Sequence, residues 1–392
     1  MEDLYIYNGK IITPFESLKG HAIHTRDGKI LSIALKENKF PEKVNALDAG
    51  GGYIVPGFID LHAHGGGGAD SMDGSTDAVN IIASTHCRYG TTSFLAATMT
   101  MSKDDIFRSL VSLKEAHKKG TNGAQVIGIH LEGPFINEEM KGAQNKEHII
   151  PPDIRLMRKF QEISGGFIKI VTLAPELPGS DELICWLCEN NIVVSAGHTN
   201  ATFEQIEAAV KLGLRHITHT FNAMTGLHHR KPGAAGAALT FKELTVELIA
   251  DGIHVHPAVM RLIVNAKEKE NVVLITDAIR AAGLPPGKYD LGGQEVSASR
   301  TKAILKDGTL AGSVLTMDRA VKNMIIKAGV SLENAMQMAT YNPAKCIGID
   351  NIKGSLASGK DADIVILNKN FETEITIVMG KAVFNRKAIK KE

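Results

Sequence analysis

The chain has 392 residues, with 44 Lys and Arg against 43 Asp and Glu and a formal net charge of +1 at pH 7. This balance leaves no basic excess to hold a nucleic acid or an anionic membrane surface, so the expected partner is a small molecule. The four cysteines are too scattered for a disulfide framework, and no segment approaches the roughly 20 apolar residues that cross a bilayer. We therefore expect a soluble, cytoplasmic protein.

The two ends of the chain share one sequence pattern. Residues 1–54 contain short alternating runs broken at Asn-Gly and Asp-Gly, which is typical of β-hairpins, and residues 352–386 repeat that pattern. The simplest packing joins both ends in a small β-sandwich domain. We place this split domain at 1–54 and 346–392, and a larger domain at 55–345.

Eight short apolar runs, rich in β-branched residues, predict buried parallel strands in the larger domain. They cover residues 57–64, 92–98, 126–132, 167–174, 192–198, 216–222, 245–251 and 272–278. Helical patterns with end signals lie between most of them, for example at 76–90, 102–120 and 202–213. This alternation predicts an α/β fold, a (β/α)8 TIM-type barrel, whose chemistry sits at the carboxyl ends of the strands.

Histidines and carboxylates stand at those strand ends. His62 and His64 close the first strand, and a spacing of two puts both imidazoles on one face. Four further strands carry a side chain of the same kind at or near their ends: Glu132, His198, His219 and Asp277. Any one of them could simply meet solvent or cap a helix. Together they suit a divalent metal such as Zn, Fe, Mn, Co or Ni.

Other polar residues near the strand ends have plainer interpretations. The glycines at 65–68 could cradle a phosphate, but they lack the Lys-Ser/Thr ending of a P-loop, which favours a flexible loop near the site. His130 shares strand parity with Glu132 and is expected either to support a ligand or to pack in the interior. His216 has the opposite parity to His219, which favours His219 as the inward residue.

Several longer stretches resemble one known family, the N-acetylglucosamine-6-phosphate deacetylases of the amidohydrolase superfamily. The matching stretches are "VPGFIDLHAHG", "HLEGPF", "SAGHTNAT", "THTFNAM", "ADGIHV", "TDA", "GTLAGS" and "NPAKCIGI", and the resemblance covers nearly the whole chain. It implies that Glu132, His198 and His219 bind one metal ion. His62 and His64 would bind a second ion, which Glu132 would bridge and Asp277 would approach.

The resemblance also implies a substrate side. Asn222, the Ala223 backbone N–H, His254 and Arg230 would form a phosphate site, with Arg230 reaching over from a neighbouring subunit, which implies a homodimer. A guanidinium suits this task because it can donate two parallel hydrogen bonds to a phosphate. Gln144 stands where many members have a histidine that contacts the substrate, and it can donate a hydrogen bond but cannot carry a positive charge.

The implied activity is that of a metal-dependent hydrolase in amino sugar metabolism. It would convert N-acetyl-D-glucosamine 6-phosphate to D-glucosamine 6-phosphate and acetate, with Asp277 as general base and then general acid. Two alternatives stay open at this point. One is deacetylation of the galactose epimer, N-acetylgalactosamine 6-phosphate, by the same machinery. The other is a non-catalytic relative that keeps the barrel as a scaffold, although such a protein is expected to lose its metal ligands.

Overall fold

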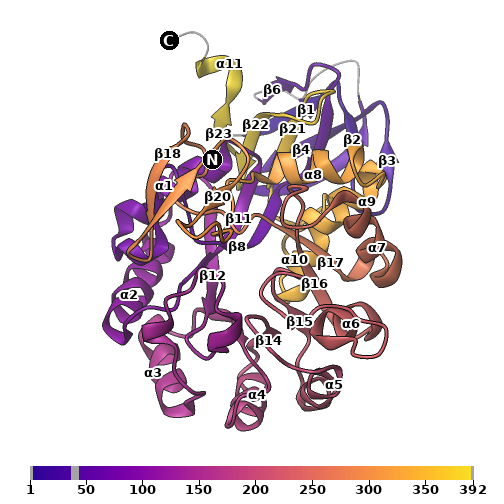
Figure 1. Ribbon diagram of the computed structural model, residues 1–392. Helices are drawn as coiled ribbons and strands as arrows, with labels where there is room; N and C mark the ends of the chain where they lie inside the picture. The colour runs from indigo at the N-terminus through magenta and orange to yellow at the C-terminus, as the bar shows by residue number, and fades with distance from the viewer. Residues whose placement is uncertain (1–2, 37–43, 390–392) are drawn as a thin grey trace.

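The computed structural model of the protein describes residues 3–36 and 44–389, and its centre is an eight-stranded parallel sheet in chain order (Figure 1). The strands are β8 (Phe58–Ala63), β11 (Thr91–Ala97), β12 (Gln125–Glu132), β13 (Ile168–Leu173), β14 (Val193–Ala196), β15 (His216–Ile217), β16 (Thr245–Ile249) and β17 (Val272–Ile275). The sheet closes where Ala63 and Ala278 form a parallel bridge. The predicted barrel is confirmed.

One helix follows each barrel strand and packs outside it, as the ring of ribbons in Figure 1 shows. These helices are α1 (Thr76–Cys87), α2 (Lys103–Lys119), α3 (Ile154–Ser164), α4 (Ser180–Glu189), α5 (Phe203–Leu212), α6 (Gly233–Thr240), α7 (Pro257–Lys267) and α8 (Met317–Ile326). The sequence signals mark their ends well. Ser102 accepts a hydrogen bond from the Asp105 amide, and Thr202 and Gln205 form a capping box.

The strands are apolar because both of their faces are covered. All six residues of β8 and all seven of β11 are buried, as expected for a parallel sheet with helices outside and side chains filling the barrel. Four strands end at least two residues earlier than predicted: β14 at Ala196, β15 at Ile217, β16 at Ile249 and β17 at Ile275. The backbone then turns at His198 and His219, whose φ angles are positive, so the pairing cannot continue to these residues.

The chain ends form two packed sheets beside the barrel (Figure 1). One contains β5 (Lys29–Leu35), β4 (His21–Arg26), β1 (Leu4–Tyr7) and β6 (Asn45–Asp48). The other contains β23 (Lys381–Asn385), β22 (Thr373–Val378), β21 (Ile364–Leu367), β7 (Tyr53–Pro56), β2 (Lys10–Ile12) and β3 (Ser17–Leu18). β21 pairs with β7, which joins the two ends of the chain in one sheet. The predicted β-sandwich from both ends is confirmed.

The sandwich core is made largely of isoleucines from both sheets, including Ile6, Ile23, Ile54, Ile364 and Ile377. The β4–β5 hairpin turns at Asp27 and Gly28, with φ angles of 51° and 77°, as a tight two-residue turn requires. Residues 1–2, 37–43 and 390–392, which the predicted small domain includes, lie outside the described residues. The exact boundaries at 54/55 and 345/346 stay a prediction.

An insertion that the sequence analysis missed lies between β17 and α8. It is a three-stranded antiparallel sheet of β18 (Gly287–Leu291), β19 (Gln294–Ala298) and β20 (Ala303–Ile304). Its apolar side packs with Met99 and Ile279, and the Gln294 side chain donates to the Ala143 carbonyl oxygen at 2.7 Å. The insertion is therefore attached to the mouth of the barrel.

The remaining elements are short. They are β9 (Gly65–Gly66), β10 (Ala69–Asp70), α9 (Leu332–Ala339), α10 (Tyr341–Cys346), α11 (Arg386–Ile389) and the 3-10 turns η1 (Ser71–Asp73), η2 (Glu138–Met140), η3 (Lys146–His148) and η4 (Lys269–Asn271). In the described part of the chain, no helix is both long and apolar enough to cross a lipid bilayer.

Candidate metal centre

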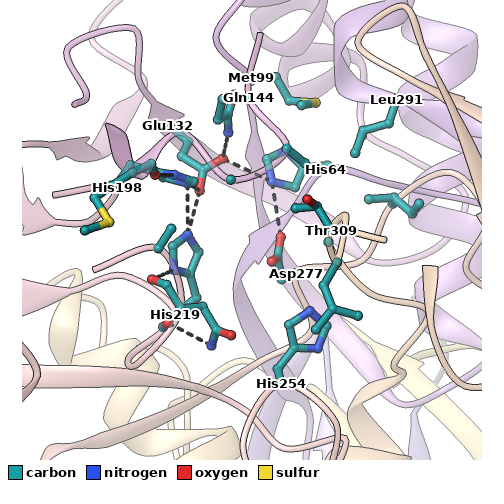
Figure 2. Close-up of a pocket in the computed structure, with 18 of the residues that line it drawn as sticks. His64, Met99, Glu132, Gln144, His198, His219, His254, Asp277, Leu291 and Thr309 are labelled. Carbon is teal, nitrogen blue, oxygen red and sulfur yellow. Dashed lines mark hydrogen bonds and ion pairs between the residues drawn. The ribbon is translucent and has the colours of Figure 1, made fainter. Parts of the chain in front are cut away.

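The predicted strand-end side chains meet at one mouth of the barrel (Figure 2). They lie at or just after the carboxyl ends of β8, β12, β14, β15 and β17, and each is at most 8% exposed: His62, His64, Glu132, His198, His219 and Asp277. Because parallel strands present their carboxyl ends to the same side, residues far apart in sequence come within a few ångströms of each other.

Glu132 stands between two groups of histidines. Its Oε1 lies 3.2 Å from Nε2 of His198 and 3.2 Å from Nε2 of His219, and these two nitrogens are 3.1 Å apart. The three side chains offer ligand atoms close enough for one metal ion to bind all of them. Two nitrogens and a carboxylate oxygen are ligands suited to a divalent transition metal.

The histidine pair forms a second cluster around the same carboxylate. The Nε2 atoms of His62 and His64 are 3.2 Å apart and each lies 3.4 Å from a Glu132 oxygen. Asp277 Oδ1 lies 3.3 Å from His64 Nε2 and 3.6 Å from His62 Nε2. Glu132 therefore belongs to both clusters, which is the position that a bridging ligand between two ions occupies.

The outer nitrogens of three histidines are held by protein acceptors. His198 Nδ1 lies 2.9 Å from the Met140 carbonyl oxygen, and His219 Nδ1 lies 3.2 Å from that of Asn222. His62 Nδ1 lies 3.0 Å from Glu247 Oε2. Each Nδ1 therefore carries a proton, which leaves each Nε2 as the nitrogen that can give a lone pair to a metal ion. The Nε2 atoms of His198 and His219 are 3.1 Å apart, and two lone pairs at that separation repel unless a proton or a cation lies between them, so the residues fit a metal.

The backbone is strained where it presents these groups. His198, His219 and Asp277 have φ angles of 49°, 28° and 50°, and Ala223 beside them has 47°. Residues with a Cβ rarely adopt this left-handed region, and such strain of about 1–3 kcal/mol per residue is typical of functional sites. The strain turns side chains that follow the strands back over the barrel mouth.

The charges in the centre stabilise one another. Burial by itself raises the pKa of the Glu132 carboxyl, but His62 and the close Nε2 atoms of His198 and His219 hold that pKa well below its usual range. Burial likewise opposes the charged form of His62, yet the carboxylates of Glu247, Glu132 and Asp277 raise its pKa well above the ordinary value. The site is thus built to keep its carboxylates ionised beside positive charge.

The centre opens into a cavity of about 320 Å³. Four residues predicted to contact substrate line it: Gln144, Asn222, Ala223 and His254. Gln144 donates from Nε2 to Glu132 Oε2 at 2.5 Å and accepts from the Thr100 amide at 2.8 Å, so it also fixes the shared carboxylate. Met99 and Leu291 add an apolar wall opposite His198, as Figure 2 shows.

Arg230 lies apart from the other predicted residues. It is exposed, its guanidinium contacts His229 Nε2 at 2.8 Å, and it is not among the residues that line the cavity. The prediction assigned it to the site of a neighbouring subunit, and that assignment stays a prediction.

Sequence reasoning missed Glu247 and the wall formed by the insertion. Glu247 lies inside β16, in the run "TVELIAD", where a charged residue within a buried strand was the available signal. His130 was expected to support a ligand or to pack in the interior. Its two ring nitrogens contact the Leu61 carbonyl oxygen at 3.0 Å and Thr172 Oγ1 at 2.7 Å, and neither faces the cavity.

A (β/α)8 barrel with histidines and carboxylates clustered at its mouth is the arrangement that metal-dependent hydrolases use. Residues 53–383 match the model of the Amidohydrolase family, and the chain therefore belongs to this family. It is 42% identical over 386 residues to the N-acetylglucosamine-6-phosphate deacetylase of Bacillus subtilis (strain 168), a match that covers 98% of each protein.

Two further relatives bear on specificity and fold. An N-acetylgalactosamine-6-phosphate deacetylase of Escherichia coli O157:H7 is 38% identical over 372 residues, covering 95% of this chain and 97% of that protein. The crystal structure of N-acetylglucosamine-6-phosphate deacetylase from Pasteurella multocida superposes with a TM-score of 0.92 at 31% identity, covering 97% of this chain and 99% of that one.

Proposed function

We propose that this protein hydrolyses the acetamido group of N-acetyl-D-glucosamine 6-phosphate, giving D-glucosamine 6-phosphate and acetate. The observation that carries the proposal is the shared carboxylate Glu132, placed between two histidine clusters and beside Asp277 at the floor of the cavity. The full-length similarity to N-acetylglucosamine-6-phosphate deacetylases supports the choice of substrate.

One or two divalent ions, of Zn, Fe, Mn, Co or Ni, complete the site in this proposal. Glu132, His198 and His219 would hold the first. His62, His64 and Asp277 would hold the second, with Glu132 as the bridge. When bound, a divalent ion supplies Lewis acidity that activates water and polarises the acetyl carbonyl.

Asp277 moves the proton. Its Oδ1 faces the histidine pair, and its carboxyl group borders the cavity where the acetyl group would lie. The carboxylate takes a proton from water as the water oxygen bonds to the acetyl carbon. It then returns that proton to the sugar nitrogen as the C–N bond breaks, so the amine leaves as a neutral group. Gln144 keeps Glu132 in place through its short hydrogen bond.

We assign the phosphate end of the substrate to the part of the cavity that His254, Asn222 and Ala223 line. His254 lines it, and its Nδ1 lies 2.6 Å from Asp251 Oδ2, so Nε2 is left to donate to an anion. Asn222 and the Ala223 backbone N–H complete this end. Arg230 belongs to the same proposal as a contribution from the partner subunit of a homodimer, and the expected cytoplasmic location stays a prediction.

Acetate release tests the assignment. We expect the metal-loaded protein to release acetate from N-acetylglucosamine 6-phosphate much faster than from N-acetylglucosamine, because a bound phosphate positions the acetamido group. Equal rates for the two sugars would contradict the phosphate site. A protein that binds no metal and releases no acetate after metal is added would instead favour the scaffold alternative.

A second candidate substrate is N-acetylgalactosamine 6-phosphate. The 38% identity to an enzyme named for that sugar favours including it. The two sugars differ in one hydroxyl orientation, so side-by-side kcat/KM values decide between them.

A further inference from the structure

Glu247 is a buried carboxylate that connects three strands of the barrel. It lies in the middle of β16 and is 0% exposed. Oε2 accepts from His62 Nδ1 and from the His219 backbone amide, each at 3.0 Å, and Oε1 lies 3.2 Å from His216 Nε2. A buried charge is costly unless several donors meet it, and here three do.

These contacts determine which nitrogen His62 turns to the centre. An ionised carboxylate can only accept hydrogen bonds, so His62 keeps a proton on Nδ1, and Nε2, which faces Glu132 and His64, is the nitrogen available to a metal ion. His198 and His219 do not depend on Glu247 in this way, because their Nδ1 atoms are held by the carbonyl oxygens of Met140 and Asn222.

His64, the other member of the pair, has weaker support. Its Nδ1 is buried and has no hydrogen-bond partner among the described residues. The position of the His62–His64 pair therefore depends mainly on His62, and the orientation of the His62 ring depends on its hydrogen bond to Glu247. If the Glu247 carboxylate is removed, His198 and His219 keep the carbonyl oxygens that hold their Nδ1 atoms, and only the His219 backbone amide loses its acceptor.

We propose that Glu247 is a positioning residue that controls filling of the His62–His64 half of the metal centre, without itself touching substrate. This inference rests on the proposed metal-dependent function and deepens it. It predicts that the two halves of the centre differ in their dependence on this one side chain. Partners of this kind typically change metal affinity about 10–100-fold.

Two variants separate the contributions of Glu247. Glu247→Ala removes all three contacts. Glu247→Gln can keep its oxygen towards His62 and the His219 amide while its NH2 group meets His216 Nε2. His216 can accept there if its Nδ1 donates to Thr245 Oγ1, 2.5 Å away. Glu247→Gln therefore preserves the geometry but loses the negative charge, and it carries the test if the alanine variant does not fold.

A matched control is Asp318→Asn. Asp318 is also a buried carboxylate of the barrel domain, 6% exposed, but its side chain contacts Thr316 and Thr373 rather than the metal centre. Loss of its charge tests the general cost of changing a buried carboxylate. Circular dichroism and thermal unfolding establish that each variant is folded.

The experiment is titration of each metal-free protein with Co²⁺, followed by its absorption spectrum and by metal analysis after gel filtration. We expect two bound equivalents for the unmodified protein and for Asp318→Asn, one for Glu247→Ala, and a second equivalent about tenfold weaker for Glu247→Gln. Two equivalents of unchanged affinity in both Glu247 variants, parallel loss of both, or a single equivalent in the unmodified protein would overturn the inference.

Acetate release by the unmodified protein, measured on the same samples, separates this inference from the proposed function. If the unmodified protein deacetylates the sugar phosphate while the Glu247 variants bind both ions normally, only the positioning role is wrong. If the metal-loaded protein releases no acetate, the proposed function itself is wrong.

Discussion

Replacement of Asp277 by Asn isolates the proton-transfer step from the rest of the site. The two side chains have the same shape, and Asp277 has a φ angle of 50°, a conformation that Asn adopts more readily than most residues. The backbone therefore has no reason to move. The amide oxygen can still face His64, which lies 3.3 Å from Oδ1, so the metal centre should remain filled.

The expected loss is large because an amide cannot accept the proton of water. General acid–base catalysis typically contributes about 10²–10⁴-fold, which corresponds to roughly 2.7–5.4 kcal/mol of transition-state stabilisation. The loss should appear in kcat. KM should change little, because the phosphate end of the cavity is formed by other residues, including His254.

The assay is acetate release from N-acetylglucosamine 6-phosphate, with metal content measured on the same sample. Asp318→Asn serves as the control for loss of a buried carboxylate elsewhere in the barrel, and it should keep nearly full turnover. If Asp277→Asn retains turnover within a few-fold of the unmodified protein while it is fully metal-loaded, the assignment of Asp277 as the proton carrier is wrong.

Three further changes test other parts of the account. Glu132→Ala should remove both ions and reduce activity to background, because both clusters share this carboxylate, and full metal content by elemental analysis would contradict the bridge. Burial lowers the pKa of His254, but its hydrogen bond to Asp251 raises it above the usual value, so the cation that attracts phosphate persists to higher pH. In Asp251→Asn the pKa of His254 falls. The preference for phosphorylated over unphosphorylated sugar, measured as the ratio of their kcat/KM values, should therefore decline at lower pH than in the unmodified protein. Identical pH profiles of this ratio in the two proteins would refute the prediction. Burial lowers the pKa of Lys267 to about 8. The unfolded chain keeps this proton up to about pH 10.4 and so binds more protons between these values, which means that stability from this group rises with pH there. Lys267→Met should remove this rise in the free energy of unfolding between about pH 8 and pH 10.4. An unchanged slope in that range would contradict the lowered pKa of Lys267.

The sequence predicted the barrel and the convergence of its strand ends because both depend on local patterns. Apolar β-branched runs marked all eight strands, and residues such as Glu132 stood visibly at their ends. Strand length was predicted less well for β15, because the turn at His219 depends on strain that the surrounding structure imposes. The apolar pattern of residues 216–222 does not by itself indicate this turn.

Contacts between distant parts of the chain could not be predicted in the same way. The acceptor of His62 Nδ1 is Glu247, 185 residues further along, and only the closed barrel brings the two together. The insertion at 287–304 was missed because its strands are short and half exposed, so their alternation is weak. Its place at the cavity depends on packing with Met99, from the loop after β11, and with Ile279, which follows β17.

The most direct test of the central claim compares acetate release from N-acetylglucosamine 6-phosphate by one preparation before and after its metal is removed and restored. The account predicts rapid release by the loaded protein, loss of that release when Glu132 and its histidines are stripped of metal, and recovery when a divalent ion is returned. Release that continues at the full rate in the metal-free protein, or none in the reloaded protein, would contradict it.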